Sequence, residues 1–81
     1  MSINFDTLKK GDVFYECEYG ITVEARVTSN ISKNTITIHD KDRIQWVWEA
    51  VDVKTGEPIS YMVTEGLEHY GPRLYKTPQY T

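Results

Sequence analysis

Apolar and polar residues alternate along much of the chain, most regularly from Ile21 to Val27, where every second residue is apolar. This two-residue period is typical of a β-strand with one buried face and one solvent-exposed face. Similar runs recur between residues that favour turns, and they predict strands over 12–17, 21–29, 35–39, 44–53, 59–64 and 73–76. The last of these is expected to be a short edge strand. The pattern therefore predicts an all-β fold of five or six short antiparallel strands.

The residues before the first strand predict a single helical turn. Asn4 is a suitable N-cap, Phe5 and Leu8 fall on one face, and Gly11 can adopt the left-handed conformation that ends a helix. We expect this N-terminal turn to close one end of a small barrel.

The hairpin between the first two strands can form in two registers. A two-residue loop would pair Glu16 with Val23 and would mix apolar and polar residues on both faces. A three-residue loop instead pairs Cys17 with Ile21, gives each strand a uniform face, and places a glycine where positive φ is required. We therefore predict the three-residue loop, with Cys17 facing the core and Phe14 on the opposite face.

The strand predicted over 44–53 has apolar residues on both faces. Trp46 and Trp48 lie on one face, and three valines lie on the other: Val47, Val51 and Val53. Because a small barrel has one interior, one of these faces must point outward. Either the valines fill the core and the tryptophans form an external platform, or the tryptophans are inside and the valines outside. In a third arrangement, the N-terminal turn or the C-terminal tail covers the second face.

Short strands, tight hairpins and an initial helical turn fit an SH3-like barrel best. An OB-like barrel is the alternative, and it is weakened because the sequence offers no helix between its third and fourth strands. The segment Lys10-Gly11-Asp12-Val13, which enters the first strand, resembles the corresponding segment of many SH3-like barrels. The whole chain also resembles the small accessory proteins of bacteriophages, because it is short, acidic and rich in Tyr, Trp, Asn and Thr. This resemblance implies a phage-type modulator of a larger enzyme or complex, and no functional residues are carried over from it.

Length and composition limit the classes of protein. The 81 residues form one domain, in which 66–81 is an irregular C-terminal segment that packs on the barrel or extends from it. The nine Lys and Arg residues are dispersed and the formal net charge is −3, which counts against a dedicated duplex-DNA binder. A single cysteine excludes an internal disulfide, and the sequence has no signal-like segment or long apolar run. We therefore expect a cytoplasmic protein without membrane association, in the host cytoplasm if a phage encodes it.

No set of residues in the sequence predicts catalysis or metal binding. Cys17, His39 and Asp40 carry the groups of a nucleophile, a base and an orienting carboxylate, but a cysteine that faces an apolar core is unreactive. His39 and His69 are thirty residues apart, and no His or Cys pair has metal-ligand spacing. The glycines stand singly at turns rather than in a phosphate-binding loop. We therefore expect no enzymatic activity, no cofactor and no metal.

Aromatic residues are the stronger indication of function. Besides the two tryptophans, the C-terminal tail interleaves aromatic and basic residues: Tyr70, Arg73, Tyr75, Lys76 and Tyr80. Tyr and Trp dominate binding hot spots, although the tail tyrosines can instead pack on the barrel with their hydroxyl groups in water. We therefore predict a non-catalytic protein-binding module with binding residues Trp46, Trp48, Tyr70, Arg73 and Tyr75.

The partner expected from this composition is an unidentified protein, or a second copy of the chain that joins through an edge strand. The alternative function is that of a small barrel that binds single-stranded nucleic acid through the same aromatic and basic residues. The acidic net charge of −3 disfavours this alternative.

Overall fold

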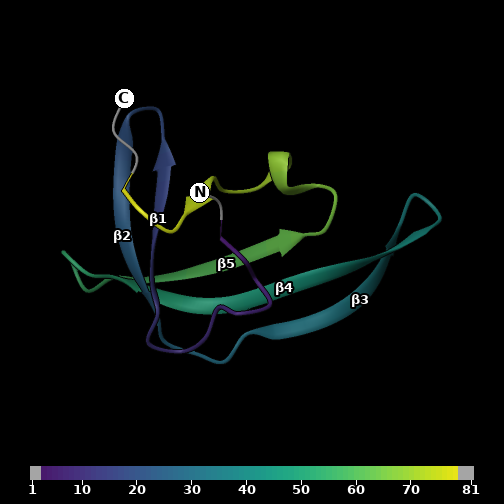
Figure 1. Cartoon of the computed structure of the whole chain (residues 1–81), viewed down its shortest axis with the longest axis horizontal. Helices are drawn as coiled ribbons and strands as arrows, with labels where there is room; N and C mark the ends of the chain where they lie inside the picture. Colours follow the sequence, from purple (N-terminus) through teal and green to yellow (C-terminus); the bar gives the residue numbers. More distant parts are fainter. Residues whose placement is uncertain (1–2, 79–81) are drawn as a thin grey trace.

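The alternating segments form strands close to those that the sequence predicts, although two of them begin three residues earlier than predicted, at Ser32 and Lys41. The computed structural model describes residues 3–78, and its strands are β1 (Val13–Glu18), β2 (Ile21–Val27), β3 (Ser32–Ile38), β4 (Lys41–Asp52), β5 (Pro58–Thr64) and β6 (Leu74–Tyr75). Helical structure in this part of the chain is confined to one 3₁₀ turn, η1 (Glu68–Tyr70), so no described helix is long and apolar enough to cross a membrane. The predicted all-β class, a small barrel-like fold, is confirmed (Figure 1).

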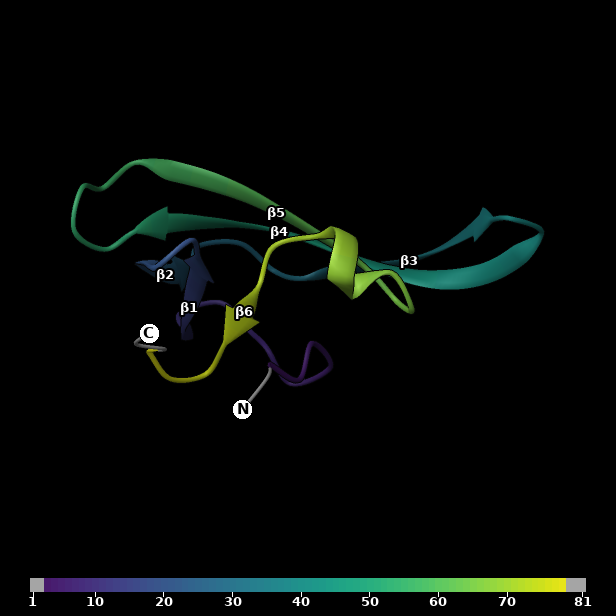
Figure 2. The same cartoon turned by 90° about the horizontal axis from the view of Figure 1, so that it is seen from above.

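The strands form one curled sheet in the order β3-β4-β2-β1-β6, with β5 also paired to β4. The long β4 pairs with β5 along one edge, through residues 45–51. Along its other edge it pairs with β3, through residues 41–47, and then with β2, through residues 50–52. No ladder joins β5 to β1 or β6 within residues 3–78, so the sheet is a half-barrel with one open side (Figure 2).

β3 and residues 41–47 of β4 form a hairpin, which we call the arm, and its outer part, which does not pair with β5, projects from the body of the molecule (Figure 1). Its turn consists of His39 and Asp40, whose φ angles of 54° and 60° are both positive. Positive φ at both central residues is typical of the type I′ turn, whose twist matches that of the two strands. Asp and His adopt this conformation more readily than most side chains, but Gly and Asn adopt it with less strain.

The predicted register of the first hairpin is wrong. β1 and β2 are joined by a two-residue turn in which Tyr19 has a φ of 52° and Gly20 a φ of 77°, and the pairing is shifted by one residue. These angles form a type I′ turn, and the match between its twist and that of the strands outweighs a uniform apolar face. As a result Phe14 is fully buried in the core, whereas Cys17 is buried on the opposite face, where the Thr22 hydroxyl donates to its Sγ at 3.6 Å.

The core lies on the concave face of the sheet and contains five aromatic rings, which we call the aromatic cluster: Phe5, Phe14, Trp46, Trp48 and Tyr61. Trp48 is 1% exposed and stacks on Tyr61 with 5.5 Å between ring centroids, while Phe14 packs edge-on against both. Phe5 stacks on Trp46 at 5.2 Å and also contacts Trp48. Because these rings come from the N-terminal segment, β1, β4 and β5, the cluster joins the two sides of the half-barrel.

The structure decides which face of β4 is buried. Both tryptophans lie in the concave core, so of the arrangements that the sequence leaves open, the one with the tryptophans inside is formed and the external platform is not. The valines occupy the outer face, where Val47 and Val51 are half-buried and Val53 is exposed. The N-terminal segment covers the tryptophans rather than the valines.

The predicted N-terminal helical turn is also wrong, because a shorter turn replaces it. The Thr7 amide donates to the Asn4 carbonyl oxygen at 3.2 Å, and the Asn4 side chain accepts a hydrogen bond from the Asp6 amide at 3.0 Å. This Asx-type turn satisfies the local backbone and presents Phe5 to the tryptophans. Gly11 has a φ of 95°, the left-handed conformation expected of the residue that ends this segment.

The first test concerns the strained turn of the arm. Replacing His39 and Asp40 with Asn and Gly is expected to raise the free energy of unfolding by about 1 kcal/mol, because Asn and Gly adopt positive φ with less strain. Urea unfolding followed by tryptophan fluorescence measures the change. The control variant carries Asn and Gly at Lys54 and Thr55, which lack positive φ, and it should gain no stability. An unchanged or lower midpoint for the arm variant would contradict the type I′ turn.

The second test uses the hydrogen bond that joins β5 to β1 across the core. The Tyr61 hydroxyl donates to Glu16 Oε1 at 2.9 Å. Burial, then this hydrogen bond and the negative charges of Glu16 and Asp52, raise the pKa of Tyr61 well above its ordinary value. The folded state therefore retains a proton that the unfolded state loses above a pH of about 10.

We accordingly expect the free energy of unfolding to fall as the pH rises above this value, by up to about 1.4 kcal/mol per pH unit from this group alone. Tyr61→Phe removes that contribution. Between a pH of about 10 and about 11, its free energy of unfolding should therefore fall less than that of the wild type. Tyr70→Phe alters a tyrosine that is 80% exposed, and it should retain the wild-type slope. If Tyr61→Phe keeps the full slope, the interior position of the Tyr61 hydroxyl is contradicted.

Candidate functional site

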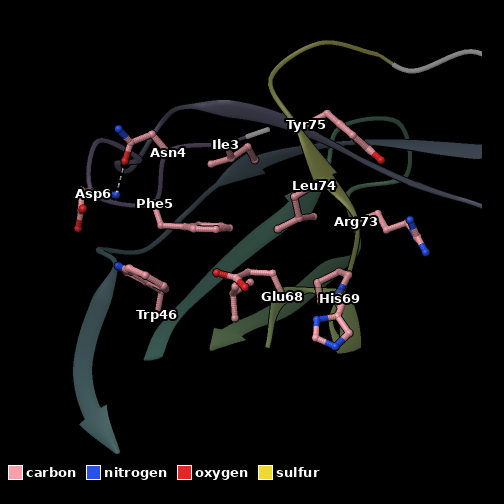
Figure 3. A pocket seen from close by; sticks show the side chains of 12 residues that line it. Ile3, Asn4, Phe5, Asp6, Trp46, Glu68, His69, Arg73, Leu74 and Tyr75 are labelled. Atoms are coloured by element: carbon pink, nitrogen blue, oxygen red, sulfur yellow. Dashed lines mark hydrogen bonds between the residues drawn. The ribbon is translucent and has the colours of Figure 1, made fainter. Parts of the chain in front are cut away.

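The open side of the half-barrel contains a groove of about 690 Å³ (Figure 3). It lies between the N-terminal segment, the concave face of β4 and β5, and the segment that contains η1 and β6. Its lining residues are Ile3, Asn4, Phe5, Asp6, Trp46, Val63, Glu68, His69, Pro72, Arg73, Leu74 and Tyr75. Sequence-distant parts of the chain thus contribute to one hollow.

The floor of the groove is apolar. Trp46 and Val63 are paired across the β4–β5 ladder and are 8% and 3% exposed, so both belong to the core and line the groove with their remaining surface. Leu74, on β6, and Ile3 are also buried, and Phe5 is half-buried. The floor therefore combines two aromatic rings with aliphatic side chains, and the core packing holds it in place.

The charged groups of the groove have different orientations. The Glu68 carboxylate, from the first residue of η1, is directed into the groove toward the Phe5 ring, whereas the Arg73 guanidinium is directed away from its centre (Figure 3). Asp6 forms an ion pair with Lys33 at 3.0 Å. Within residues 3–78, no side chain donates a hydrogen bond to the Glu68 carboxylate. The groove therefore contains the carboxylate of Glu68, an exposed residue that has no ion-pair partner within residues 3–78.

A second hollow, of about 440 Å³, adjoins the groove, and we call it the tyrosine hollow. It is lined by Glu18, Tyr19, His69, Tyr70, Gly71 and Arg73. His69 and Arg73 line both hollows and so form the ridge between them. Tyr19 is 100% exposed and Tyr70 is 80% exposed, and the Tyr70 ring lies 4.0 Å from the His69 ring, centroid to centroid.

The structure brings together only some of the binding residues that the sequence predicts. Trp46, Arg73 and Tyr75 line the groove, and Tyr70 lies with Arg73 in the tyrosine hollow. Trp48 is fully buried in the aromatic cluster and lines neither hollow. The tail residue Tyr80 lies outside the described residues. The predicted set is thus divided between the core, the groove and the hollow beside it.

Sequence reasoning missed the residues that give the groove its charge and its aromatic wall. From the sequence, Glu68 is expected to be an ordinary surface carboxylate, and Phe5 is expected to lie in a helical turn. The apolar character of Phe5 was a usable signal, since an aromatic residue before the first strand must pack somewhere on the barrel. No sequence signal places Glu68 beside Phe5, because only the path of the chain across the open side brings them together.

The candidate catalytic groups are far apart. Cys17 lies near the end of β1, whereas His39 and Asp40 form the tip of the arm, at the other end of the molecule (Figure 1). Within residues 3–78, no group of three or more His, Cys, Asp or Glu residues could hold a metal ion.

A comparison with protein-family models finds no match for this chain, and neither does a search of curated proteins or of solved structures.

Proposed function

We propose that this chain is a non-catalytic protein-binding module that modulates a larger enzyme or complex by taking a basic and apolar segment of its partner into the groove. The observation that carries the proposal is the Glu68 carboxylate, which is directed over a floor that contains Phe5 and Trp46. The short, acidic chain, which resembles small bacteriophage accessory proteins, suits such a role. We place it in the cytoplasm, because a single cysteine is compatible with a reducing compartment.

A carboxylate beside aromatic rings attracts a cationic side chain in two ways. The carboxylate forms a charge-assisted hydrogen bond with Lys or Arg, and the face of an aromatic ring attracts the same cation through its quadrupole. In the groove, Glu68 would supply the first interaction and Phe5 or Trp46 the second. The formal net charge of −3 also favours approach of a basic partner.

Because the floor of the groove is apolar, the partner's segment should contain apolar residues as well as basic ones. The stem of a Lys or Arg side chain, or a neighbouring aliphatic residue, would cover Val63 and Leu74 and exclude water from the carboxylate. The volume of about 690 Å³ is typical of a concave site that holds a few side chains. Arg73, on the ridge, would then contact an acidic group at the edge of the segment.

Selection of short random peptides against the folded chain tests this function. We expect enrichment of peptides in which Lys or Arg is adjacent to Leu, Ile or Phe. Glu68→Gln should weaken the binding of an enriched peptide by about tenfold, because it removes the charge and keeps the shape of the side chain. The matched control is Glu65→Gln, an exposed carboxylate that does not line the groove, and it should leave the affinity unchanged. Failure to enrich basic peptides, or binding that is indifferent to Glu68→Gln, would contradict the proposal.

The nucleic-acid alternative would use the tyrosine hollow. Its exposed rings and Arg73 are suited to base stacking, but Glu18 in the same hollow would repel a phosphate backbone. Titration with oligothymidine at low salt distinguishes the two functions, and the protein-binding proposal expects no binding. Binding that is lost in both Tyr70→Ala and Arg73→Ala, but retained in the exposed-arginine control Arg26→Ala, would favour the alternative.

A further inference from the structure

The outer edge of β3 has no partner in the described part of the chain. β3 pairs with β4 along one edge, and no hydrogen bond within residues 3–78 involves the backbone of its other edge. The amide and carbonyl groups on that edge therefore face solvent along the length of the arm. Such an edge is a template for the addition of another strand.

The other outer strands of the sheet have features that discourage strand addition, whereas β3 has one such feature, the charged residue Lys33. β5 begins at Pro58, and the chain at Gly71 lies beside the Met62 carbonyl group. β6 contains only two residues. β3 is seven residues long, contains no proline, and has an alternating Thr-Ile-Thr-Ile end that favours extended structure. Its single charged residue, Lys33, forms an ion pair with Asp6.

We propose that β3 pairs with β3 of a second copy of this chain to form a symmetric dimer. The central antiparallel register places Thr35 opposite Thr35 on the two-fold axis and uses all seven residues of each strand. Asn34 of one copy then lies opposite Ile36 of the other, and Lys33 lies opposite Thr37. Residues that share a face in one copy face the same side in the dimer, as continuous sheet pairing requires.

The charges on the arm are complementary in this register. The Thr37 hydroxyl donates to Asp42 Oδ1 at 2.9 Å, and the two residues are paired across the β3–β4 ladder. Lys33 of one copy therefore lies opposite Thr37 of the other, in the same row as Asp42, so a cation and a carboxylate share one row, with Thr37 between them, on each side of the two-fold axis. No charged residue lies directly opposite a like charge, and this favours a second copy over an unrelated partner.

The outer face of the arm is also complementary to itself. In one copy Ser32, Val47 and Met62 form one row across β3, β4 and β5, and Met62 is 58% exposed. The proposed register adds Ile38 of the second copy to this row, beside the small Ser32 side chain. Two such rows would extend the apolar surface across the interface and shield part of it from water.

Sedimentation velocity of the full chain, from low micromolar to millimolar concentration, tests the dimer. We expect a reversible monomer–dimer equilibrium. Thr35→Lys should weaken it by about tenfold or more, because two lysines then face each other on the axis, and Thr35→Glu should do the same. Mixing equal amounts of the two variants should restore a dimer at least as stable as that of the wild type, a result that misfolding of either variant could not produce. Thr28→Lys, at an exposed position outside β3, is the control and should not change the equilibrium.

A monomer at every concentration, or a mixture of the charge variants that stays monomeric, would overturn the proposal. A wild-type monomer whose arm instead pairs with an added peptide strand would also overturn it, because the partner would not be a second copy. Thr35 does not line the groove, so peptide binding that depends on Glu68 should be unaffected by Thr35→Lys. The dimer and the proposed function can therefore fail independently.

Discussion

The aromatic cluster on the concave face is the interaction on which the rest of the structure depends. The sheet does not close through backbone hydrogen bonds, since no ladder joins β5 to β1 or β6 in the described part of the chain. Side chains replace the missing ladder: Trp48 on β4 stacks on Tyr61, Phe14 on β1 packs against both, and the Tyr61 hydroxyl donates to Glu16. Each ring pair contributes about 0.5–1.5 kcal/mol beyond the burial of its surface, which is considerable for a domain of this size.

This way of closing the half-barrel also produces the groove. Phe5 enters the open side and covers Trp48 and Trp46, so the core is sealed by a loop rather than by a strand. A loop covers less of the opening than a paired strand would, and the groove remains beside it. η1 and β6 form the other wall of this groove. The core and the candidate site therefore share residues. Trp46 packs in the cluster and also lines the groove, which gives the floor the rigidity of the core.

The sequence predicts the strands well and their pairing less well, for a physical reason. Alternation such as that of Ile21 to Val27 reports which residues are extended, but a shift of one residue exchanges the faces, and the turn decides it. The dipeptide Tyr19-Gly20 lacks the asparagine that usually marks a type I′ turn, so the register was predicted wrongly. Arg73 was predicted from composition alone and does line the groove, because β6 pairs with β1. Glu68 could not be predicted, since its role comes entirely from the path of the chain.

The groove and the arm use different chemistry, and β4 links them. β4 carries Trp46 and Trp48 into the core beneath the groove, and its residues 41–47 pair with β3 at the edge of the sheet, so Trp46 belongs to both parts. In the proposed dimer the two-fold axis is perpendicular to the sheet at Thr35, so both concave faces lie on the same side of the joined sheet. Two grooves would then open in the same direction. A partner with repeated basic segments, or a partner that is itself dimeric, would engage both grooves at once and bind more tightly than either groove allows, because the second contact becomes intramolecular. A shallow groove on a small protein would thereby gain affinity without a larger core.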